Sequence, residues 1–154
     1  MAWRAARLVN IAVINGPNLN LLGSREPELY GAETLHEIEA DLRHIADELG
    51  TSIEFSQHNG EGEIIDRIQD LRGRADGLLV NAGAYTHSSL AVRDALVAVG
   101  TPYVEVHLTN IYSREPLRRR SMLARDAVAT ITGFGAYGYE LALRGLVRML
   151  RASG

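Results

Sequence analysis

Five short apolar runs alternate with amphipathic segments along this chain, and this alternation constrains the fold more than any other feature. Many residues in the runs are β-branched, and the first and third runs are apolar at nearly every position, which is typical of strands covered on both faces. The runs are Leu8–Ile14, Ser52–Phe55, Gly77–Val80, Tyr103–Val106 and Val128–Ile131. We expect each run to form a strand.

Segments with the period of a helix lie between the runs. The clearest one, residues 35–49, has leucine or isoleucine every three or four positions; a capping box of Thr34 with Glu37 precedes it and Gly50 ends it. The other expected helices are Glu63–Arg72, Ser89–Val99, Pro116–Leu123 and Tyr139–Leu150. This alternation predicts a single α/β domain over residues 1–154, with a five-stranded parallel sheet in the flavodoxin-like order 2-1-3-4-5 and helices on both faces.

Two residue types are absent from the sequence, and their absence excludes several kinds of chemistry. Without cysteine, the chain has no disulfide, thiolate metal site or cysteine nucleophile. All 16 basic residues are arginine, so the chain forms neither a lysine Schiff base nor the lysine contact of a phosphate-binding P-loop. The net charge of −3 argues against a nucleic-acid surface and against a polybasic membrane patch.

Membrane and secretion signals are not recognisable in the sequence. No stretch approaches the 18 or so consecutive apolar residues of a membrane span. The first seven residues contain two arginines but no apolar segment of the kind that a secretory signal carries. We therefore expect a cytoplasmic protein, with residues 1–7 as an extension of no assigned role.

Polar and glycine residues gather where the predicted strands end. Parallel strands place their carboxyl ends on one edge of the sheet, and ligands bind outside that edge near the point where the strand order reverses. The polar clusters are residues 15–20, 57–62, 81–87, 105–110 and 133–135. Their concentration predicts a binding site at this edge.

The loop Asn15–Tyr30 is much longer than the roughly two to six residues of an ordinary strand-to-helix connection, so we interpret it as a lid. It carries Arg25 and ends in Tyr30. A guanidinium close to a tyrosine favours the phenolate, which makes Tyr30 a candidate general base. The alternative is that Tyr30 only anchors the loop on the surface.

Histidine side chains supply the candidate acid. His107 follows the fourth run, and Glu105 lies two residues earlier on the same face of the strand, where a carboxylate can orient an imidazole and favour its charged form. His87 stands at the start of a predicted helix and could bind a hydroxyl group. Alternatively, His107 is an ordinary strand-end histidine and His87 an ordinary cap residue.

Arginines cluster after the fourth run. Arg114 and Arg118 are four residues apart, so on a helix they would share a face, and one or both could point at the site. We expect no metal, because His36, His44 and His58 lack a metal-ligand spacing. Residues 133–138 resemble a dinucleotide fingerprint only superficially, since they follow the last strand and no acidic ribose ligand follows them.

Taken together, these segments closely resemble the type II 3-dehydroquinate dehydratases, in the family's order and spacing from about residue 8 to residue 150. Each segment alone is moderate evidence, but the set is highly specific. The matching segments are Ile14–Gly23, Arg25–Pro27, Tyr30–Gly31, Asn81–Ser89, Glu105–Asn110, Arg114–Arg118 and Gly133–Gly135.

The resemblance implies a flavodoxin-like fold that assembles as trimers within a dodecamer. It also implies the reversible loss of water from 3-dehydroquinate to give 3-dehydroshikimate, through an enolate and with neither cofactor nor metal. The absence of lysine fits independently, because the unrelated type I enzymes form an imine through a lysine, which this chain lacks.

Catalytic roles also follow from the resemblance. Tyr30 would be the base that removes a proton next to the ketone, with Arg25 favouring its phenolate. Asn18, acting through a water molecule, would stabilise the enolate oxygen. His107, oriented by Glu105, would protonate the departing C1 hydroxyl.

The substrate-binding groups implied by the resemblance divide into two sets. The substrate carboxylate would be held by Asn81 and by the backbone N–H groups of Leu108 and Thr109. The ring hydroxyls would be contacted by Arg118, His87 and Asp94, with Asp94 supplied by the neighbouring subunit of the trimer.

Two other classes of protein fit parts of the sequence. A flavodoxin-like electron carrier or regulator would bind flavin or phosphate through a Ser/Thr/Gly-rich loop after the first strand, but residues 15–18 read Asn-Gly-Pro-Asn. A non-catalytic, partner-binding relative would be expected to lack Tyr30, Arg25 or His107, and all three are present. For the enzyme, we expect a role in the shikimate pathway of aromatic amino-acid biosynthesis, with quinate breakdown as the alternative because it uses the same dehydration.

Overall fold

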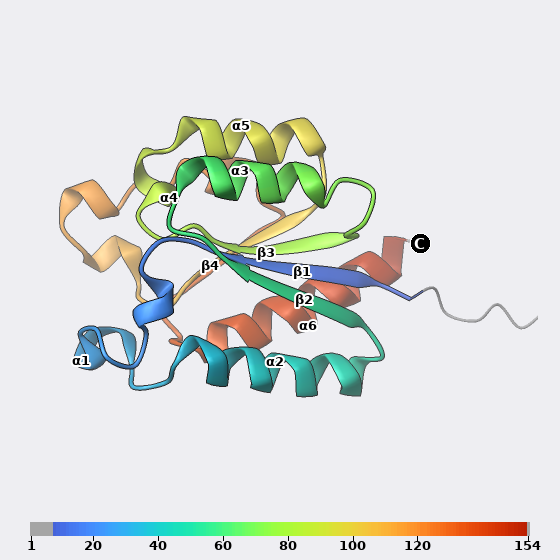
Figure 1. The fold of residues 1–154 in the computed structure, drawn as a ribbon, viewed down its shortest axis with the longest axis horizontal. Coiled ribbons are helices and arrows are strands. Elements are labelled where there is room, and N and C mark those ends of the chain that lie inside the picture. The colour runs from blue at the N-terminus through green and yellow to red at the C-terminus, as the bar shows by residue number, and fades with distance from the viewer. Residues whose placement is uncertain (1–7, 154) are drawn as a thin grey trace, which may run out of the picture.

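The computed structural model of the protein describes residues 8–153, in which strands alternate with helices (Figure 1). The strands are β1 (Asn10–Asn15), β2 (Ser52–Gln57), β3 (Gly77–Asn81), β4 (Tyr103–His107) and β5 (Ala129–Thr132). The α-helices are α1 (Pro27–Tyr30), α2 (Leu35–Leu49), α3 (Glu61–Asp70), α4 (Tyr85–Ser88), α5 (Leu90–Val99) and α6 (Tyr137–Ser153). Short 3₁₀ helices are η1 (Leu19–Leu21), η2 (Ile111–Ser113), η3 (Pro116–Arg118) and η4 (Ala124–Asp126). The expectation for residues 1–7 lies outside the described residues.

The five described strands form one parallel sheet in the order β2-β1-β3-β4-β5, which confirms the order predicted from the sequence. Every position of β3 and β4 is buried. By contrast, β5 forms an edge of the sheet and exposes Ala129 and Thr130. The sequence order reverses between β1 and β3, so the chain leaves these two neighbouring strands toward opposite faces of the sheet.

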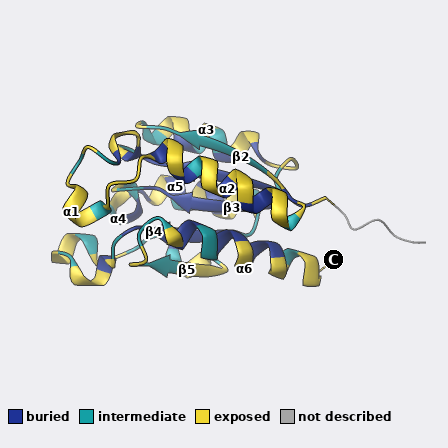
Figure 2. Ribbon diagram, turned by 90° about the horizontal axis from the view of Figure 1, so that it is seen from below, coloured by how far each residue is buried: buried dark blue, intermediate teal, exposed yellow. Residues whose placement is uncertain are grey.

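Helices cover both faces of the sheet: α3 and α5 lie on one side, and α2 and α6 lie on the other (Figure 1). Adjacent residues of β1 point to opposite faces, so that Val13 packs in the cluster with α2 and α6, while Ile14 packs in the cluster with α3 and α5. Figure 2 shows the burial that results, with the central strands mostly dark blue, the outer strands β2 and β5 more exposed, and helices whose outer surfaces are exposed. The two apolar layers enclose the sheet and hold it rigid.

Helix boundaries match the sequence pattern closely where capping signals are present. In α2, the Thr34 hydroxyl accepts a hydrogen bond from the Glu37 N–H, the Glu37 carboxylate accepts one from the Thr34 N–H, and Gly50 ends the helix at a φ of 64°. Helix α3 begins and ends two residues earlier than predicted, and α6 extends beyond the predicted 139–150 at both ends.

The predicted helix Pro116–Leu123 is wrong. Only the 3₁₀ helix η3 forms there, and the chain then follows an irregular path to η4. The Ser121 hydroxyl accepts hydrogen bonds from the backbone N–H groups of Leu123 and Ala124, both at 3.1 Å. A serine that binds the backbone of following residues in this way competes with helical hydrogen bonding, which explains the difference.

The chain leaves the strands at one end of the molecule, where α1, α4 and the loops between β4 and β5 lie (Figure 1). The loops after β1 and β3 pack against each other here, since a Cβ atom on Gly16 would lie 2.4 Å from the carbonyl oxygen of Ala82. Only glycine permits this approach. In the described part of the chain, no helix has the length and apolar character of a membrane span.

Candidate active site

A cavity of about 140 Å³ opens at the carboxyl edge of the sheet, where the loops after β1, β3 and β4 meet. Glu105 lies behind its wall, and Asp94 lies elsewhere on the surface. The other residues that the sequence predicts for the site all line this cavity: Asn18, Arg25, Tyr30, Asn81, His87, His107, Leu108, Thr109 and Arg118. The structure therefore brings together residues from three separate segments of the chain.

Tyr30 ends helix α1 at the cavity wall, and Gly31 closes the helix in a left-handed conformation with a φ of 89°. The guanidinium carbons of Arg25 and Arg114 lie 5.2 and 5.8 Å from the centre of the Tyr30 ring. Arg114 also donates a hydrogen bond from Nη1 to the Tyr30 hydroxyl over 3.4 Å. Two cations therefore flank the phenol, and cations at such distances stabilise an anionic phenolate.

His107 and Glu105 form a buried pair on one face of β4, with exposed fractions of 6% and 1%. Nε2 of His107 lies 2.7 Å from Oε1 of Glu105. A carboxylate in this position fixes the orientation of the imidazole ring. With Nε2 occupied by Glu105, the nitrogen of His107 available to a ligand is Nδ1.

His87 lies on α4 with its ring stacked beside that of His107, at a centre-to-centre distance of 6.3 Å. Its Nδ1 is 2.7 Å from the carbonyl oxygen of Arg120. A carbonyl oxygen can only accept, so Nδ1 of His87 carries the hydrogen. Nε2 of a neutral His87 is then free to accept a hydrogen bond from a ligand hydroxyl.

Asn81 ends β3 and belongs to a buried chain of hydrogen bonds beneath the cavity. Its Nδ2 donates to the Tyr139 hydroxyl over 2.9 Å, and that hydroxyl donates to Oδ1 of Asn15 over 2.6 Å. Oδ1 of Asn81 accepts from the N–H of Gly83 over 3.2 Å. Burial raises the pKa of Tyr139 well above its ordinary value, so its hydroxyl stays neutral and remains a donor. These contacts fix the orientation of the Asn81 amide.

Asn18 stands in the loop after β1 with a φ of 68°, a left-handed conformation that asparagine tolerates better than most residues. Its backbone N–H donates to Oδ1 of Asn59 over 3.1 Å. Leu108 and Thr109 directly follow β4 and also line the cavity. The cavity thus has neutral polar groups beside its charged residues.

Arg118 reaches the cavity from η3 and donates from Nε to Oε1 of Glu115 over 2.5 Å. The backbone N–H of Glu115, followed by this guanidinium, holds the pKa of the Glu115 carboxyl below its ordinary value. The sequence suggested that Arg114 and Arg118 share a helix face. They do not, because the predicted helix does not form. Both nevertheless line the cavity, through the irregular path of the chain from η2 to η3.

Asp94 does not join the cavity of its own chain. It is exposed on α5, and its Oδ1 accepts from Nη1 of Arg93 over 3.1 Å.

Tyr139 and Ser121 also contact residues of the site, although the sequence did not single them out. Tyr139 is 124 residues from Asn15 in the chain, and no local pattern in the sequence signals that contact.

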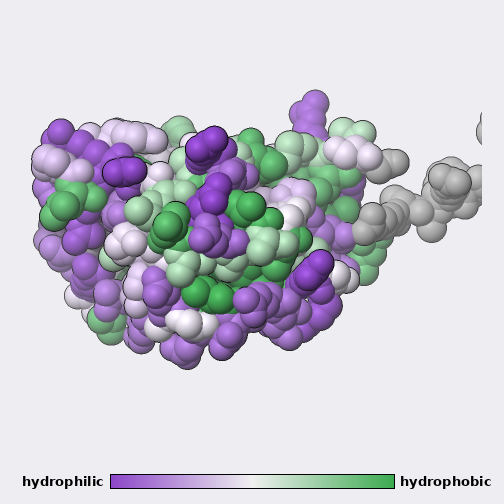
Figure 3. Space-filling model, turned by 90° about the horizontal axis from the view of Figure 1, so that it is seen from above, coloured by the Kyte–Doolittle hydropathy of each residue, from purple (hydrophilic) through white to green (hydrophobic). Residues whose placement is uncertain are grey.

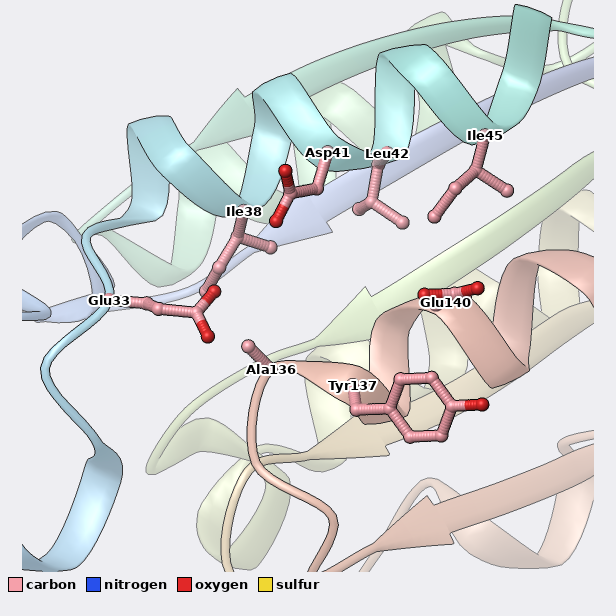
Figure 4. Close-up of a pocket in the computed structure, with 8 residues that line it drawn as sticks. All are labelled: Glu33, Ile38, Asp41, Leu42, Ile45, Ala136, Tyr137 and Glu140. Atoms are coloured by element: carbon pink, nitrogen blue, oxygen red, sulfur yellow. The ribbon is translucent and has the colours of Figure 1, made fainter. Parts of the chain in front are cut away.

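A second cavity, between α2 and α6, shares no lining residue with the first. Figure 4 shows the carboxylates of Glu33, Asp41 and Glu140 beside apolar side chains that include Ile38 and Leu42. Neither histidine nor arginine lines it. Across residues 8–153, no group of three or more histidine, aspartate and glutamate side chains is placed to hold a metal ion. Of these two cavities, the first is the one lined by the candidate acid and base.

Comparison with known proteins identifies close relatives over nearly the whole chain. Residues 9–147 match the protein family described as dehydroquinase class II. The chain is 57% identical over 140 residues to a 3-dehydroquinate dehydratase of Gemmatimonas aurantiaca, covering 91% of this chain and 92% of that protein. It is 54% identical over 143 residues to a 3-dehydroquinate dehydratase of Prochlorococcus marinus, covering 93% of this chain and 99% of that protein.

Solved structures give the same relationship. The crystal structure of a type II dehydroquinase from Butyrivibrio crossotus superposes with a TM-score of 0.88 at 40% sequence identity, covering 90% of this chain and 97% of the other. A type II dehydroquinase from Propionibacterium acnes also superposes with a TM-score of 0.88, at 37% identity, covering 94% and 99% of the two chains.

Proposed function

This chain belongs to the dehydroquinase class II family, and we propose that it removes water from 3-dehydroquinate to give 3-dehydroshikimate, by an elimination through an enolate. One geometric observation carries the proposal: a tyrosine flanked by two arginines and a histidine backed by a buried glutamate line one cavity. A proton acceptor and a proton donor on one cavity are what an elimination of water requires.

The first step uses Tyr30 as the base. Its phenolate takes a proton from the carbon next to the ketone, and the electron pair moves to the ketone oxygen to form the enolate. Arg25 over the ring and Arg114 at the hydroxyl favour the ionised form of Tyr30. Asn18, through a water molecule, stabilises the negative charge that develops on the enolate oxygen.

The second step uses His107 as the acid. The enolate collapses to form the new carbon–carbon double bond, and the C1 hydroxyl leaves as water with a proton from Nδ1 of His107. Glu105 stabilises the charged imidazole before the transfer and orients it throughout. Tyr30 then holds the proton taken from the substrate, His107 is short of the proton that left with the water, and proton exchange with solvent restores both groups. Neither metal nor cofactor takes part in these steps.

The polar groups around the cavity hold the substrate in this position. Asn81 and the backbone N–H groups of Leu108 and Thr109 bind the carboxylate. Arg118 and Nε2 of His87 bind ring hydroxyls, with His87 accepting because its Nδ1 already donates to Arg120.

Assembly completes the site in this proposal, which takes the active protein to be trimers within a dodecamer. Support comes from α5, where Leu90, Asp94 and Val97 follow each other at spacings of four and three residues and so share one helix face. Leu90 and Val97 are 59% and 45% exposed. Figure 3 shows that apolar side chains reach the surface on this side of the molecule. An apolar face around Asp94 suits a subunit interface that delivers this carboxylate to a neighbouring cavity.

In the cell, we assign the chain a cytoplasmic role as one catalytic domain in the shikimate pathway of aromatic amino-acid biosynthesis. The assignment rests on the resemblance and on the reaction itself. Rescue of a dehydroquinase-deficient bacterial strain on medium without aromatic amino acids tests it, and failure of an enzyme that is active in vitro would contradict it.

Incubation with 3-dehydroquinate tests the proposed reaction directly. The conjugated product absorbs in the ultraviolet, so the initial rate at which the absorbance rises should be proportional to the enzyme concentration. Borohydride with substrate should leave the activity intact, because no lysine is present to form a reducible imine. No absorbance change would overturn the reaction, and inactivation by borohydride would overturn the enolate route.

A further inference from the structure

Ser121, in the irregular segment between η3 and η4, makes three hydrogen bonds that together determine where its own hydrogen points. Its Oγ accepts from the backbone N–H groups of Leu123 and Ala124, both at 3.1 Å. Oγ also lies 2.5 Å from Oε1 of Glu105. A hydroxyl has two acceptor positions and one hydrogen. Because both acceptor positions are occupied, the hydrogen of Ser121 is donated to Glu105.

This donation affects the oxygen of Glu105 that faces the candidate acid. Oε1 of Glu105 lies 2.5 Å from Ser121 and 2.7 Å from Nε2 of His107. An ionised carboxylate only accepts, so Oε1 of Glu105, which the Ser121 donation stabilises in that form, accepts from His107 as well. Nε2 of His107 must therefore carry a hydrogen, and Nδ1 is the nitrogen that faces the cavity.

We propose that Ser121 is a positioning residue that holds Glu105 as an acceptor and thereby fixes the hydrogen of neutral His107 on Nε2. Ser121 acts through Glu105 and does not touch the reacting atoms. The significance for catalysis rests on the proposed function: with the hydrogen on Nε2 committed to Glu105, the second proton that makes His107 an acid binds at Nδ1 and is delivered from there to the leaving hydroxyl. The tautomer itself is a property of the resting protein, whatever its substrate.

The same segment also contacts the second histidine, His87, and this histidine serves as an internal reference. The carbonyl oxygen of Arg120, the residue before Ser121, accepts from Nδ1 of His87 over 2.7 Å. The N–H of Met122 donates to the carbonyl oxygen of Thr86 over 2.9 Å, which anchors the segment beside α4. Neither contact uses the Ser121 side chain. His87 should therefore keep its hydrogen on Nδ1 when the Ser121 hydroxyl is removed.

The chain offers a matched control for a merely structural effect. Ser89 also accepts a backbone N–H, from Val92 at 2.9 Å, and donates to a carboxylate, Oε2 of Glu61 at 2.5 Å. Glu61 is not within the hydrogen bonds described for either histidine of the site. Ser89→Ala therefore loses the same two kinds of hydrogen bond as Ser121→Ala, without the link to His107.

The experiment records long-range ¹H–¹⁵N correlation spectra of the imidazole rings in the full chain without substrate. Wild type should show His107 with its hydrogen on Nε2 and His87 with its hydrogen on Nδ1. In Ser121→Ala, the His107 signals should move toward the other tautomer while those of His87 stay unchanged. Ser121→Thr, which keeps a hydroxyl, should restore the wild-type pattern, and Ser89→Ala should not disturb it.

Kinetics with 3-dehydroquinate extend the test to the reaction. Losing a hydrogen bond to a charged group should lower kcat about tenfold in Ser121→Ala, with KM within about twofold of wild type. If Ser121→Ala does not fold, Ser121→Cys keeps the volume with a much weaker donor and should shift the same signals. An unchanged His107 tautomer in the folded variant overturns the proposal, even if kcat falls. An inactive wild type overturns the proposed function and leaves the tautomer result standing.

Discussion

The hydroxyl of Tyr139 on α6 accepts a hydrogen bond from Nδ2 of Asn81 at the end of β3, over 2.9 Å and across 58 residues of sequence. Tyr139 is fully buried, and the same hydroxyl donates to Asn15. One hydrogen of the Asn81 amide is therefore committed to the core, and the amide cannot rotate without breaking this contact. We expect Tyr139 to orient Asn81 toward the substrate carboxylate.

Tyr139→Phe removes this hydroxyl while keeping the ring. The KM for 3-dehydroquinate should rise about tenfold with a smaller change in kcat, because a binding group loses its orientation. The free energy of unfolding should fall by about 1–3 kcal/mol, since buried amide groups are left without partners. Steady-state kinetics and urea denaturation check both effects. Tyr112→Phe, at an exposed position, should change neither. A fall in kcat with unchanged KM would contradict an orienting role in binding.

The free energy of unfolding at alkaline pH should reveal that the Tyr139 hydroxyl is buried. Burial raises its pKa above the ordinary value of about 10, so above pH 10 the unfolded chain loses this proton while the folded chain keeps it. The folded state then binds more protons, and stability must fall as pH rises, by up to about 1.4 kcal/mol per pH unit for this group. The chain has no lysine or cysteine, so tyrosines dominate side-chain titration in this range.

Urea denaturation at pH 8 and at pH 11 measures this effect. The stability difference between wild type and Tyr139→Phe should be largest at pH 8 and should narrow at pH 11. Because Tyr103 is also buried with a raised pKa, the wild-type slope contains more than one contribution, and the variant serves to isolate Tyr139. A constant difference between the two proteins would show that Tyr139 titrates normally in the folded state.

Tyr30→Phe should abolish turnover while substrate binding largely survives. The phenol oxygen is required to accept a proton, and a positioned base contributes about 100-fold or more to the rate. Turnover and the dissociation constant of a non-reacting substrate analogue are the two measurements. If the variant kept more than about a tenth of the wild-type rate, another group would be the base.

Arg25→Gln should lower the rate and move the active pH range upward, because a cation that favours the phenolate is lost. Arg114→Gln should shift it in the same direction, since Arg114 contacts the Tyr30 hydroxyl directly. Arg43→Gln is the matched control, because Arg43 lies 4.7 Å from the centre of the Phe55 ring, outside the site. A lower rate with an unmoved pH profile would leave Arg25 as a lid or binding residue only.

The strands and the cavity at the carboxyl edge of the sheet could be predicted because both follow from local patterns, and the strand order is a common one for a doubly wound sheet. Apolar alternation fixes which segments are strands, and the polar clusters after them fall on one edge in any parallel sheet. The capped helix α2 shows the same agreement between sequence and structure.

The contact of Glu105 with His107 could be predicted because the two residues are neighbours on one strand face, but the contacts that orient Tyr30 and Asn81 join residues far apart in the chain and could not be predicted. Arg114 meets Tyr30 across 84 residues, and Tyr139 meets Asn15 across 124. The segment around Ser121 was predicted as a helix because its composition allows one. There, side-chain hydrogen bonds to the backbone prevailed over that local preference.

Asp94→Ala should weaken substrate binding although Asp94 does not reach the cavity of its own chain. In the proposed assembly it reaches a neighbour's cavity, where it binds a ring hydroxyl or steadies Arg118. Folding should be little affected, because the exposed pair of Asp94 with Arg93 contributes little to stability. Asp126→Ala is the matched control, since Asp126 also pairs with Arg93, at 2.9 Å. Equal activity of Asp94→Ala and wild type would contradict the shared site.

Mixing two variants with different defects tests whether each site is built from two chains. A Tyr30→Phe chain keeps Asp94, and an Asp94→Ala chain keeps Tyr30. When subunits of the two exchange in equal amounts, roughly a quarter of the interfaces in a symmetric trimer pair an intact Tyr30 with an intact Asp94. At a substrate concentration too low to saturate Asp94→Ala, activity should therefore return toward that fraction as exchange proceeds, while each variant alone stays well below it and mixing two Tyr30→Phe samples restores nothing. Complementation requires the carboxylate to act across the interface, because no single chain in the mixture carries both groups. An isolated monomer that turns over normally would defeat this arrangement.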